Sequence, residues 1–600
     1  MKKEAEVILE ASWEVCNKVG GIYTVIQSKA DKITENYKDN YLLIGPYFAK
    51  QAIGQFEEKL PKDKVRDIFT KLKKEGIICH FGEWLIKGTP NVILIDYTNI
   101  MNNVNTIKRK LWDDYRIDSL NAPHDYNEPI VWSYAVYLFV KEFTGLFNKN
   151  IVCQFHEWLA GSALLHLKKD SVDVATIFTT HATVLGRTLS GNNIDLYCKD
   201  GDKKCFLENI DPDKEAYNYN VAAKHQIEKA SAQQADIFTT VSEITGMEAN
   251  FVLGRKPEFL LPNGLDIEKF PTFEEVSIKH RLQRSRIREF LLYYFMPYYV
   301  FDLKETIFYF IAGRYEFHDK GIDVLIKALG KLNDLLKKEK SKKTIVAFIW
   351  VPANIRGIKP ELLENKTLYS DIKEYLEEAE EEVEESILYS FVSRKKIKEE
   401  ELFDHDFLLE MKGRVLRFKR RGNPLISTHD LYDENDLILK SLIEVGLDNG
   451  GDDKVKVVYY PTYLSGADGL LNLTFYEAMQ GSHLGIFPSF YEPWGYTPLE
   501  AGALGVSSVT TDLAGFGRYI EKETSGKKNP GIFVLKRFGR SETEVVKDLT
   551  DFLYYYANLS KYGRIENKMA ARGLASLADW KLLINNYIKT FNEALKRHKK

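Results

Sequence analysis

The sequence predicts an α/β protein of two domains, each built on a mostly parallel β-sheet. At 600 residues the chain exceeds the size at which a single hydrophobic core stops growing. Short β-branched and apolar runs recur between helical stretches, which is typical of parallel strands joined by helical crossovers. The turn-forming cluster Leu261-Pro262-Asn263-Gly264 interrupts this pattern. We therefore expect one Rossmann-like domain over residues 1–265 and a second over 266–571.

The predicted strands form one group in each domain. In the first half they lie near Val7–Leu9, Tyr41–Ile44, Val92–Ile95, Ile151–Phe155, Thr176–Thr180 and Ile237–Val241. In the second half they lie near Ile307–Ala312, Ile345–Trp350, Val455–Tyr460, Leu484–Phe487, Ser507–Thr510 and Ile532–Leu535. Ligands of open α/β sheets bind beyond the carboxyl ends of the strands. Polar residues follow four of these strands: His156, His181, Arg314 and Glu492. The sequence thus predicts an active site in a cleft between the domains.

Residues 360–447 interrupt the second sheet with mostly helical patterning. Apolar residues recur there at helical spacing from Ile372 to Phe391 on a background of glutamates, so one apolar stripe needs a partner. Two interpretations stay open. The segment is either an element that assembles copies of the chain or a helical hairpin packed on its own domain.

Composition excludes several classes of function. Hydrophobic residues at 44%, charged residues at 28% and a net charge of −3 favour neither a nucleic-acid partner nor a membrane partner. No signal-peptide pattern and no membrane-spanning apolar run is found, so we expect a cytoplasmic location. The five cysteines show no CxxC or Cys/His spacing, which argues against a disulfide framework and a zinc site. Glycine-rich dinucleotide and Walker patterns are absent from the sequence as well.

The segment 490–500 has the highest density of residues that could take part in binding or catalysis. It sets two carboxylates, Glu492 and Glu500, around a tight turn. Thr497 followed by Pro498 predicts the N-cap and first residue of a helix, whose backbone N–H groups would form an anion site beside Glu492. The same spacing also fits a plain capping box, in which Glu500 only accepts a hydrogen bond from a backbone N–H.

This segment resembles the nucleotide-binding segment of glycogen synthases of glycosyltransferase family 3. Other blocks resemble that family in chain order: Val19–Val25, Phe155–Gly161, Thr180–Arg187, Gly313–Phe317 and Lys320–Asp323. The similarity spans nearly the whole chain. It implies a GT-B fold, with two Rossmann-like domains facing a cleft, a helical insertion in the C-terminal domain, and a helix at about 572–600 that completes the first domain. It also implies transfer of glucose from a nucleoside diphosphate to an α-1,4-glucan, without cofactor or metal.

The resemblance assigns roles to individual residues. The implied catalytic residues are Glu492, Arg187, Lys320 and His181. The implied substrate-binding residues are Lys18, Gly20, Gly21, Arg314, Phe475, Trp494, Gly495, Tyr496, Thr497 and Glu500. Simpler interpretations stay open for three of these residues. Lys18 also fits a solvated surface lysine, Gly20 an ordinary turn, and Phe475 a residue of the hydrophobic core.

The residue types suit the implied chemistry. Departure of a diphosphate builds negative charge, which a guanidinium and an ammonium stabilise without a metal. Arg187 and Lys320 come from different predicted domains, so both reach the phosphates only when the cleft closes. Glu492 either stabilises positive charge on the sugar or attacks it as a nucleophile, and we favour the first role.

The resemblance further implies partners. We expect UDP-glucose as the donor, with ADP-glucose as the alternative, and glycogen or another α-1,4-glucan as the acceptor. The insertion implies a homo-oligomer, either a tetramer or a trimer. Two other functions stay open: a retaining hexosyltransferase with a different acceptor or a sucrose-type substrate, and a catalytically silent glucan-binding scaffold.

Overall fold

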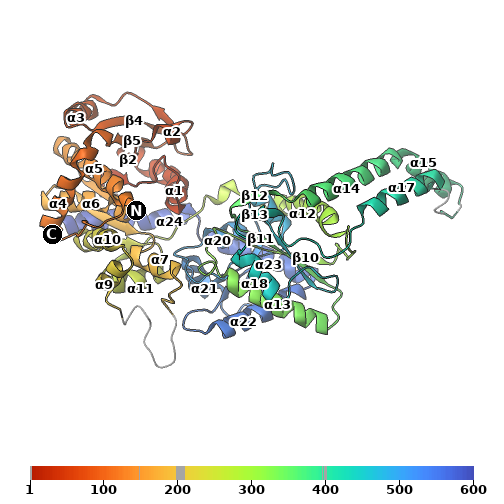
Figure 1. The fold of residues 1–600 in the computed structure, drawn as a ribbon. Helices are drawn as coiled ribbons and strands as arrows, with labels where there is room; N and C mark the ends of the chain where they lie inside the picture. Colours follow the sequence, from red (N-terminus) through yellow and green to blue (C-terminus); the bar gives the residue numbers. More distant parts are fainter. Residues whose placement is uncertain are drawn as a thin grey trace.

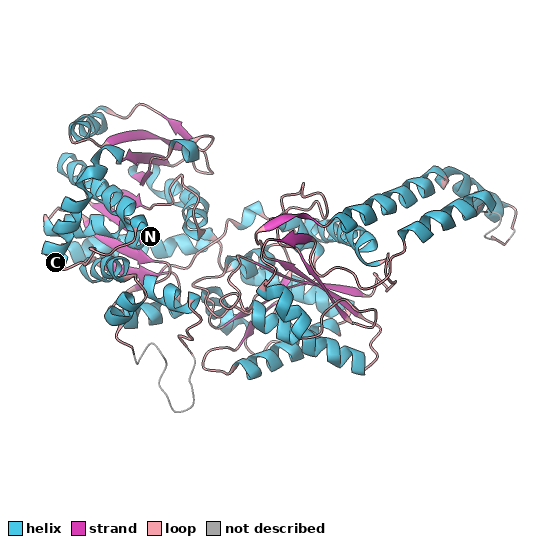
Figure 2. Cartoon of the chain, viewed as in Figure 1, coloured by secondary structure: helices cyan, strands magenta, loops and turns pink. Residues whose placement is uncertain are grey.

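The computed structural model describes residues 3–147, 149–197, 210–394, 396–397, 402–403 and 405–599. They form two α/β lobes and a helical arm that projects from the second lobe (Figures 1 and 2). Cys198 and Cys205 lie outside the described residues, whereas Cys16, Cys79 and Cys153 are free thiols. No helix within the described ranges combines the length and the apolar character needed to cross a bilayer.

The N-terminal lobe is built on a sheet that, in the described part of the chain, has nine strands in the order β3-β4-β5-β2-β1-β6-β7-β8-β9. The strands are β1 (Val7–Ala11), β2 (Tyr41–Pro46), β3 (Phe56–Glu58), β4 (Ile78–Trp84), β5 (Asn91–Asp96), β6 (Ile151–His156), β7 (Ala175–Thr180), β8 (Ile237–Thr240) and β9 (Phe259–Leu260). Every strand predicted in this half is confirmed. From β5 to β9 neighbouring strands pair in parallel. The edge strands β3 and β4 are antiparallel, and the sequence pattern missed them because they are half-exposed and lack a continuous apolar run.

The C-terminal lobe is built on a sheet of six described strands, all parallel, in the order β14-β11-β10-β15-β16-β17. The strands are β10 (Thr306–Ala312), β11 (Thr344–Trp350), β14 (Val455–Tyr459), β15 (Leu484–Ile486), β16 (Ser507–Thr511) and β17 (Ile532–Leu535). All of them were predicted. Most of them are apolar runs because helices cover both faces of a parallel sheet, whereas β16 is buried but consists of serine, valine and threonine.

Helices cover both sheets. In the N-terminal lobe they are α1 (Gly21–Tyr37), α2 (Ala49–Ala52), α3 (Asp63–Lys74), α4 (Val104–Tyr115), α5 (Asn127–Leu146), α6 (Glu157–Lys169), α7 (Val184–Gly191), α9 (Pro212–Asn218), α10 (Ala222–Gln234) and α11 (Glu243–Val252). In the C-terminal lobe they are α12 (Phe273–Phe295), α13 (Ile322–Lys338), α18 (Leu437–Glu444), α19 (Phe475–Gly481), α20 (Tyr496–Ala503), α21 (Gly515–Thr524), α22 (Glu542–Ala557) and α23 (Lys561–Ser576).

The last helix, α24 (Trp580–His598), crosses back to the N-terminal lobe, where it packs against α1 and β7 (Figure 1). The buried indole of Trp580 donates a hydrogen bond from Nε1 to Ser28 Oγ at 2.7 Å. The chain therefore crosses between the lobes twice, once after β9 and once before α24.

The arm consists of α14 (Pro360–Glu378), α15 (Glu380–Val392) and α17 (His405–Phe418), with α14 and α17 side by side. Arg414 of α17 pairs with Asp371 of α14 and lies over the Tyr375 ring. A short antiparallel pair that the sequence did not predict, β12 (Ile355–Ile358) and β13 (His429–Leu431), closes its base. At the far end Phe391 is 70% exposed. The arm thus packs on itself as a helical hairpin and leaves apolar side chains uncovered at its tip. Its role in assembling copies of the chain stays a prediction.

Gly321 ends the turn that leads into α13. Its φ is +70°, and a Cβ there would lie 2.0 Å from the Pro488 carbonyl oxygen. We expect Gly321→Ala to destabilise the protein by about 2–4 kcal/mol, because it adds left-handed backbone strain to a clash with rigid backbone. The apparent melting temperature measures this. Gly413→Ala is the matched control, since Gly413 lies in α17 with open space around it. Equal melting of Gly321→Ala and the wild type would contradict the expectation.

Candidate active site

The predicted catalytic residues follow the carboxyl ends of strands, three of them in loops and Arg187 on a helix, where the two lobes meet. His181 follows β7, and Arg187 lies on the next helix, α7, both in the N-terminal lobe. Lys320 precedes α13, and Glu492 lies between β15 and α20, both in the C-terminal lobe. Figure 1 shows α7 facing α20 and α21 across the boundary of the lobes.

Lys320 and Glu492 form an ion pair, although they are far apart in the sequence. Lys320 Nζ lies 2.5 Å from Glu492 Oε2, and both side chains are largely shielded. Glu316 contributes a second carboxylate 3.8 Å from the same ammonium and also pairs with Arg314 at 2.9 Å. Together with Thr497, the Lys320–Glu492 pair lines a small hollow. The cations of Arg314 and Lys320 thus alternate with the carboxylates of Glu316 and Glu492. An incoming phosphate would compete with these carboxylates for the two cations.

The turn before α20 differs from the sequence expectation. The helix begins at Tyr496 rather than Pro498, and its N-cap residue is Gly495, with φ of +103°, rather than Thr497. The capping-box alternative is wrong, because the Glu500 carboxylate accepts a hydrogen bond from the Tyr476 hydroxyl at 2.8 Å instead of from a backbone N–H. Only a residue without a side chain adopts this left-handed turn without strain.

Glu500 provides a pH-dependent prediction. Partial burial raises the pKa of Glu500 to about 7, with the Tyr476 hydrogen bond opposing the rise. Because the raised pKa puts protonation near neutrality, the carboxylate loses acceptor capacity as the pH falls through this value. If it accepts hydrogen bonds from the donor's ribose hydroxyls, the KM for the donor rises about tenfold between about pH 8 and about pH 6. Initial rates against donor concentration at each pH measure this.

Glu500→Gln is the control for that titration. Glutamine keeps the size of the side chain but does not ionise, so its KM should be raised and flat across the same range. A wild-type KM that does not change with pH would contradict the role of Glu500.

His181 is held by a buried chain of polar groups. His181 Nε2 lies 3.0 Å from His156 Nδ1, and His156 Nε2 lies 2.7 Å from Glu10, which pairs with Lys29 at 2.5 Å. Burial lowers the pKa of both histidines, so both are neutral. Since a carboxylate only accepts hydrogen bonds, His156 donates from Nε2 and accepts from His181. This series of hydrogen bonds fixes the orientation of the His181 ring.

Arg187 is an exposed cation on α7, in the lobe that does not hold the Lys320–Glu492 pair. Carboxylates of both lobes stabilise its charge, namely Glu157 and Glu248 from the N-terminal lobe and Glu316 from the C-terminal lobe. Within the described part of the chain its guanidinium makes no hydrogen bond or ion pair. Its donors are therefore available to a ligand between the lobes.

The double glycine lies at the start of α1, which begins at Gly21. The N–H groups of Gly20 and Tyr23 both donate to Glu14 Oε2 at 2.8 Å. A Cβ on Gly20 would lie 3.0 Å from Glu14 Oε1, so the missing side chain accommodates this carboxylate. The sequence analysis did not identify Glu14. An acidic residue within a buried stretch is the feature that could have indicated it.

The remaining predicted residues are spread around the site. Lys18 is exposed in the β1–α1 loop, and Phe475 opens α19 half-buried. Trp494 is 4% exposed and packs against Phe516, so only its backbone can face a ligand. The Tyr496 hydroxyl lies 3.5 Å from the carbonyl oxygen of Gly264, beside the first crossing between the lobes.

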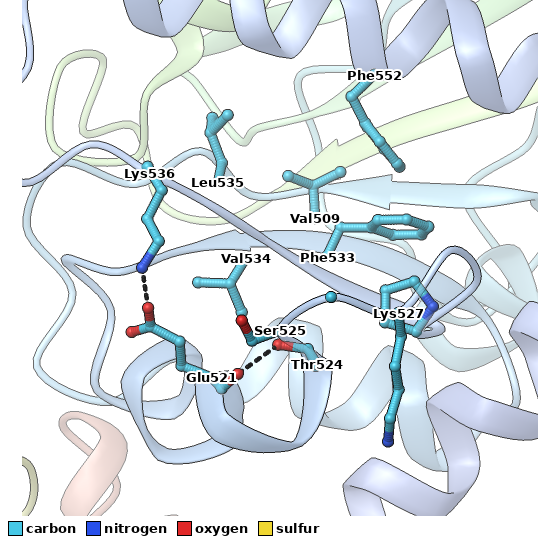
Figure 3. A pocket seen from close by; sticks show the side chains of 12 residues that line it. Val509, Glu521, Thr524, Ser525, Lys527, Phe533, Val534, Leu535, Lys536 and Phe552 are labelled. Carbon is cyan, nitrogen blue, oxygen red and sulfur yellow. Dashed lines mark hydrogen bonds and ion pairs between the residues drawn. The ribbon is translucent and has the colours of Figure 1, made fainter.

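A larger pocket lies elsewhere, at the outer edge of the second sheet (Figure 3). Its volume is about 260 Å³, and apolar side chains including Val509, Phe533 and Phe552 line it. Glu521 and Lys536 pair across one side. None of the predicted site residues contributes to its wall.

Comparison with known proteins identifies the family. The glycogen synthase family model matches residues 10–599. The chain is 37% identical to the liver glycogen (starch) synthase of Mus musculus over 585 residues, which are 97% of this chain and 82% of that protein. The chain belongs to the glycogen synthase family. Another member, the glycogen (starch) synthase of Neurospora crassa, is 36% identical over 598 residues, covering 98% of this chain and 84% of that protein.

Among solved structures, the catalytic domain of starch synthase IV from Arabidopsis thaliana, bound to ADP and acarbose, has a similar fold. It matches with a TM-score of 0.50 and 12% identity, over 99% of this chain and 100% of that one. At that identity the likeness shows the fold alone, and it confirms the predicted GT-B class. Family and fold together make this glycogen synthase family member a glycosyltransferase.

Proposed function

We propose that this family member transfers glucose from UDP-glucose, in preference to ADP-glucose, to the non-reducing 4-hydroxyl of an α-1,4-glucan, with retention of the α configuration. The observation that carries the proposal is the Lys320–Glu492 ion pair at 2.5 Å in one lobe, together with Arg187 in the other lobe, whose guanidinium has no hydrogen bond or ion pair among the described residues. Cations from both lobes at the ends of parallel strands suit a diphosphate, and a carboxylate beside them suits the sugar that it carries.

In the proposed reaction Arg187, Arg314 and Lys320 stabilise the leaving diphosphate, while Glu492 stabilises positive charge on the sugar. The bond between C1 and the phosphate oxygen breaks, and a bond between C1 and the acceptor 4-oxygen forms on the same face. The acceptor proton passes to the leaving phosphate oxygen. Retaining glycosidases use a second carboxylate at the anomeric carbon, whereas here Glu500 is tied to Tyr476.

Incorporation of labelled glucose into glycogen by the purified protein tests the proposal, with UDP-glucose and ADP-glucose supplied side by side. We expect an alkali-stable α-1,4 product, formed faster from UDP-glucose. A faster reaction with ADP-glucose would overturn the donor preference alone. No product from either donor, with nucleotide binding intact, would favour a different acceptor, and loss of nucleotide binding would favour a silent glucan-binding scaffold.

We also propose that the arm joins copies of the chain into a homo-oligomer, a tetramer or a trimer. Its tip exposes Leu388 and Phe391 beside acidic residues, with no described residue covering them. Sedimentation equilibrium of the wild type and of Phe391→Asp tests this, and we expect the variant to have the lower mass. A monomeric wild type would contradict the proposal.

A further inference from the structure

A segment of the C-terminal lobe is buried in the N-terminal lobe directly before Glu492. Phe490 and Tyr491 are 3% and 7% exposed and pack in the same core cluster as Leu185 and Ile244 of the N-terminal lobe. The Tyr491 hydroxyl donates a hydrogen bond to Glu248 Oε1 on α11 at 3.1 Å. The position of the Glu492 loop therefore depends on contact with the opposite lobe.

A second contact between the lobes lies directly before Lys320. Ser190, on the same helix as Arg187, donates from Oγ to Asp319 Oδ1 at 2.5 Å. The Asp319 carbonyl oxygen in turn accepts from the backbone N–H of Phe490 at 2.8 Å and of Tyr491 at 3.2 Å. Asp319 thus binds the N-terminal lobe through its side chain and the Glu492 loop through its backbone.

Glu248 connects these contacts back to α7. Its buried carboxylate accepts from Thr183 Oγ1 at 2.6 Å and from the Tyr197 hydroxyl at 2.8 Å, in addition to Tyr491. Thr183 is the N-cap of α7. A buried carboxylate needs such donors, so separation of the lobes would remove one of its partners and leave water to replace it.

We infer that Tyr491 and the Ser190–Asp319 pair are positioning residues that form a latch between the lobes. Their contacts run from α7 through the Lys320 turn and the Glu492 loop back to α7. The latch therefore brings Arg187, Lys320 and Glu492 together only when the lobes meet. This inference rests on the proposed function, in which the lobes close around the nucleotide sugar.

The latch contacts suit a reversible closure. The Tyr491–Glu248 and Ser190–Asp319 contacts are hydrogen bonds between side chains that water can replace, so opening leaves no buried polar group permanently without a partner. The burial of Phe490 and Tyr491 in the N-terminal lobe favours the closed form. Neither Tyr491 nor Ser190 needs to touch substrate. Loss of either contact should act on turnover through the fraction of closed molecules, and not mainly on the affinity of the open form for the donor.

The test compares Tyr491→Phe and Ser190→Ala with Tyr309→Phe. Tyr309 is the matched control, since its buried hydroxyl donates to the Leu553 carbonyl at 2.8 Å within one lobe. Small-angle X-ray scattering with and without saturating UDP measures closure without requiring turnover. Kinetics with UDP-glucose give kcat, KM and the ratio of donor hydrolysis to glucosyl transfer, and melting temperatures show whether each variant folds.

We expect UDP to contract the wild type and Tyr309→Phe, while the two latch variants keep the larger radius of gyration. Their kcat should fall about tenfold, the loss expected for one hydrogen bond, and their hydrolysis ratio should rise because water enters an open site. Latch variants that contract as fully as the wild type would overturn the inference, as would a wild type that binds UDP without contracting. Failure of the proposed function is distinct. A wild type that UDP contracts but that forms no glucan from either donor contradicts the proposed reaction and leaves the latch intact. Calorimetry of UDP binding separates a wild type that does not bind UDP, which contradicts the proposed function, from one that binds UDP without contracting, which overturns the latch.

Discussion

Replacement of Glu492 by alanine is expected to lower kcat by about 10²–10³-fold while leaving donor binding nearly intact. In the proposed reaction the carboxylate stabilises charge that develops on the sugar only in the transition state, and loss of one such group has an effect of this size. Donor affinity should persist because Lys320, released from its 2.5 Å ion pair, stays available to the phosphates. Labelled-glucose incorporation measures kcat, and calorimetry measures the dissociation constant of UDP-glucose.

Glu492→Gln is the matched control, because it keeps the size of the side chain and removes only the charge. Similar losses in both variants would show that charge is what matters. Azide separates the two roles of Glu492, since a missing nucleophile is replaced by azide to give a β-glucosyl azide, whereas a missing stabilising charge is not. Near-normal turnover in Glu492→Ala would mean that the catalytic carboxylate lies elsewhere.

Replacement of Arg187 by alanine should weaken both donor binding and turnover, and lower kcat/KM by about 10³-fold. Its guanidinium has no partner among the described residues, so a ligand's phosphate would be its principal contact. Charge-assisted bidentate hydrogen bonds are present in the bound state and strengthen as the diphosphate departs. Arg187→Lys should recover only part of the loss, because an ammonium cannot reproduce the planar fork.

Arg109→Ala on α4 is the matched control, since that arginine is also exposed on the N-terminal lobe but is 3.8 Å from Asp113 in an ordinary surface pair. It should behave as the wild type. Equal donor dissociation constants for Arg187→Ala and Arg109→Ala would contradict a phosphate contact at Arg187.

Sequence pattern predicted the core strands of both sheets because strands buried on both faces are rich in apolar and β-branched residues. It failed at β3 and β12, where strands are short and half-exposed, so neither composition nor alternation separates them from loops. It also misplaced the start of α20 by two residues. Thr497 has the chemistry of an N-cap, but the backbone there is set by tertiary hydrogen bonds from Gly515 to Glu492 and from Phe516 to Trp494.

The identity of the chemical groups could be inferred from the chain alone. Residues at the ends of strands are grouped by topology, so His181, Arg314 and Glu492 could be assigned to one site before any coordinates were known. Their partners could not be inferred in this way. The pairing of Lys320 with Glu492 joins two loops of the C-terminal lobe, and the contact of Tyr491 with Glu248 joins the two lobes. Such contacts depend on how elements far apart in the sequence pack together, and no local pattern of residues encodes that packing.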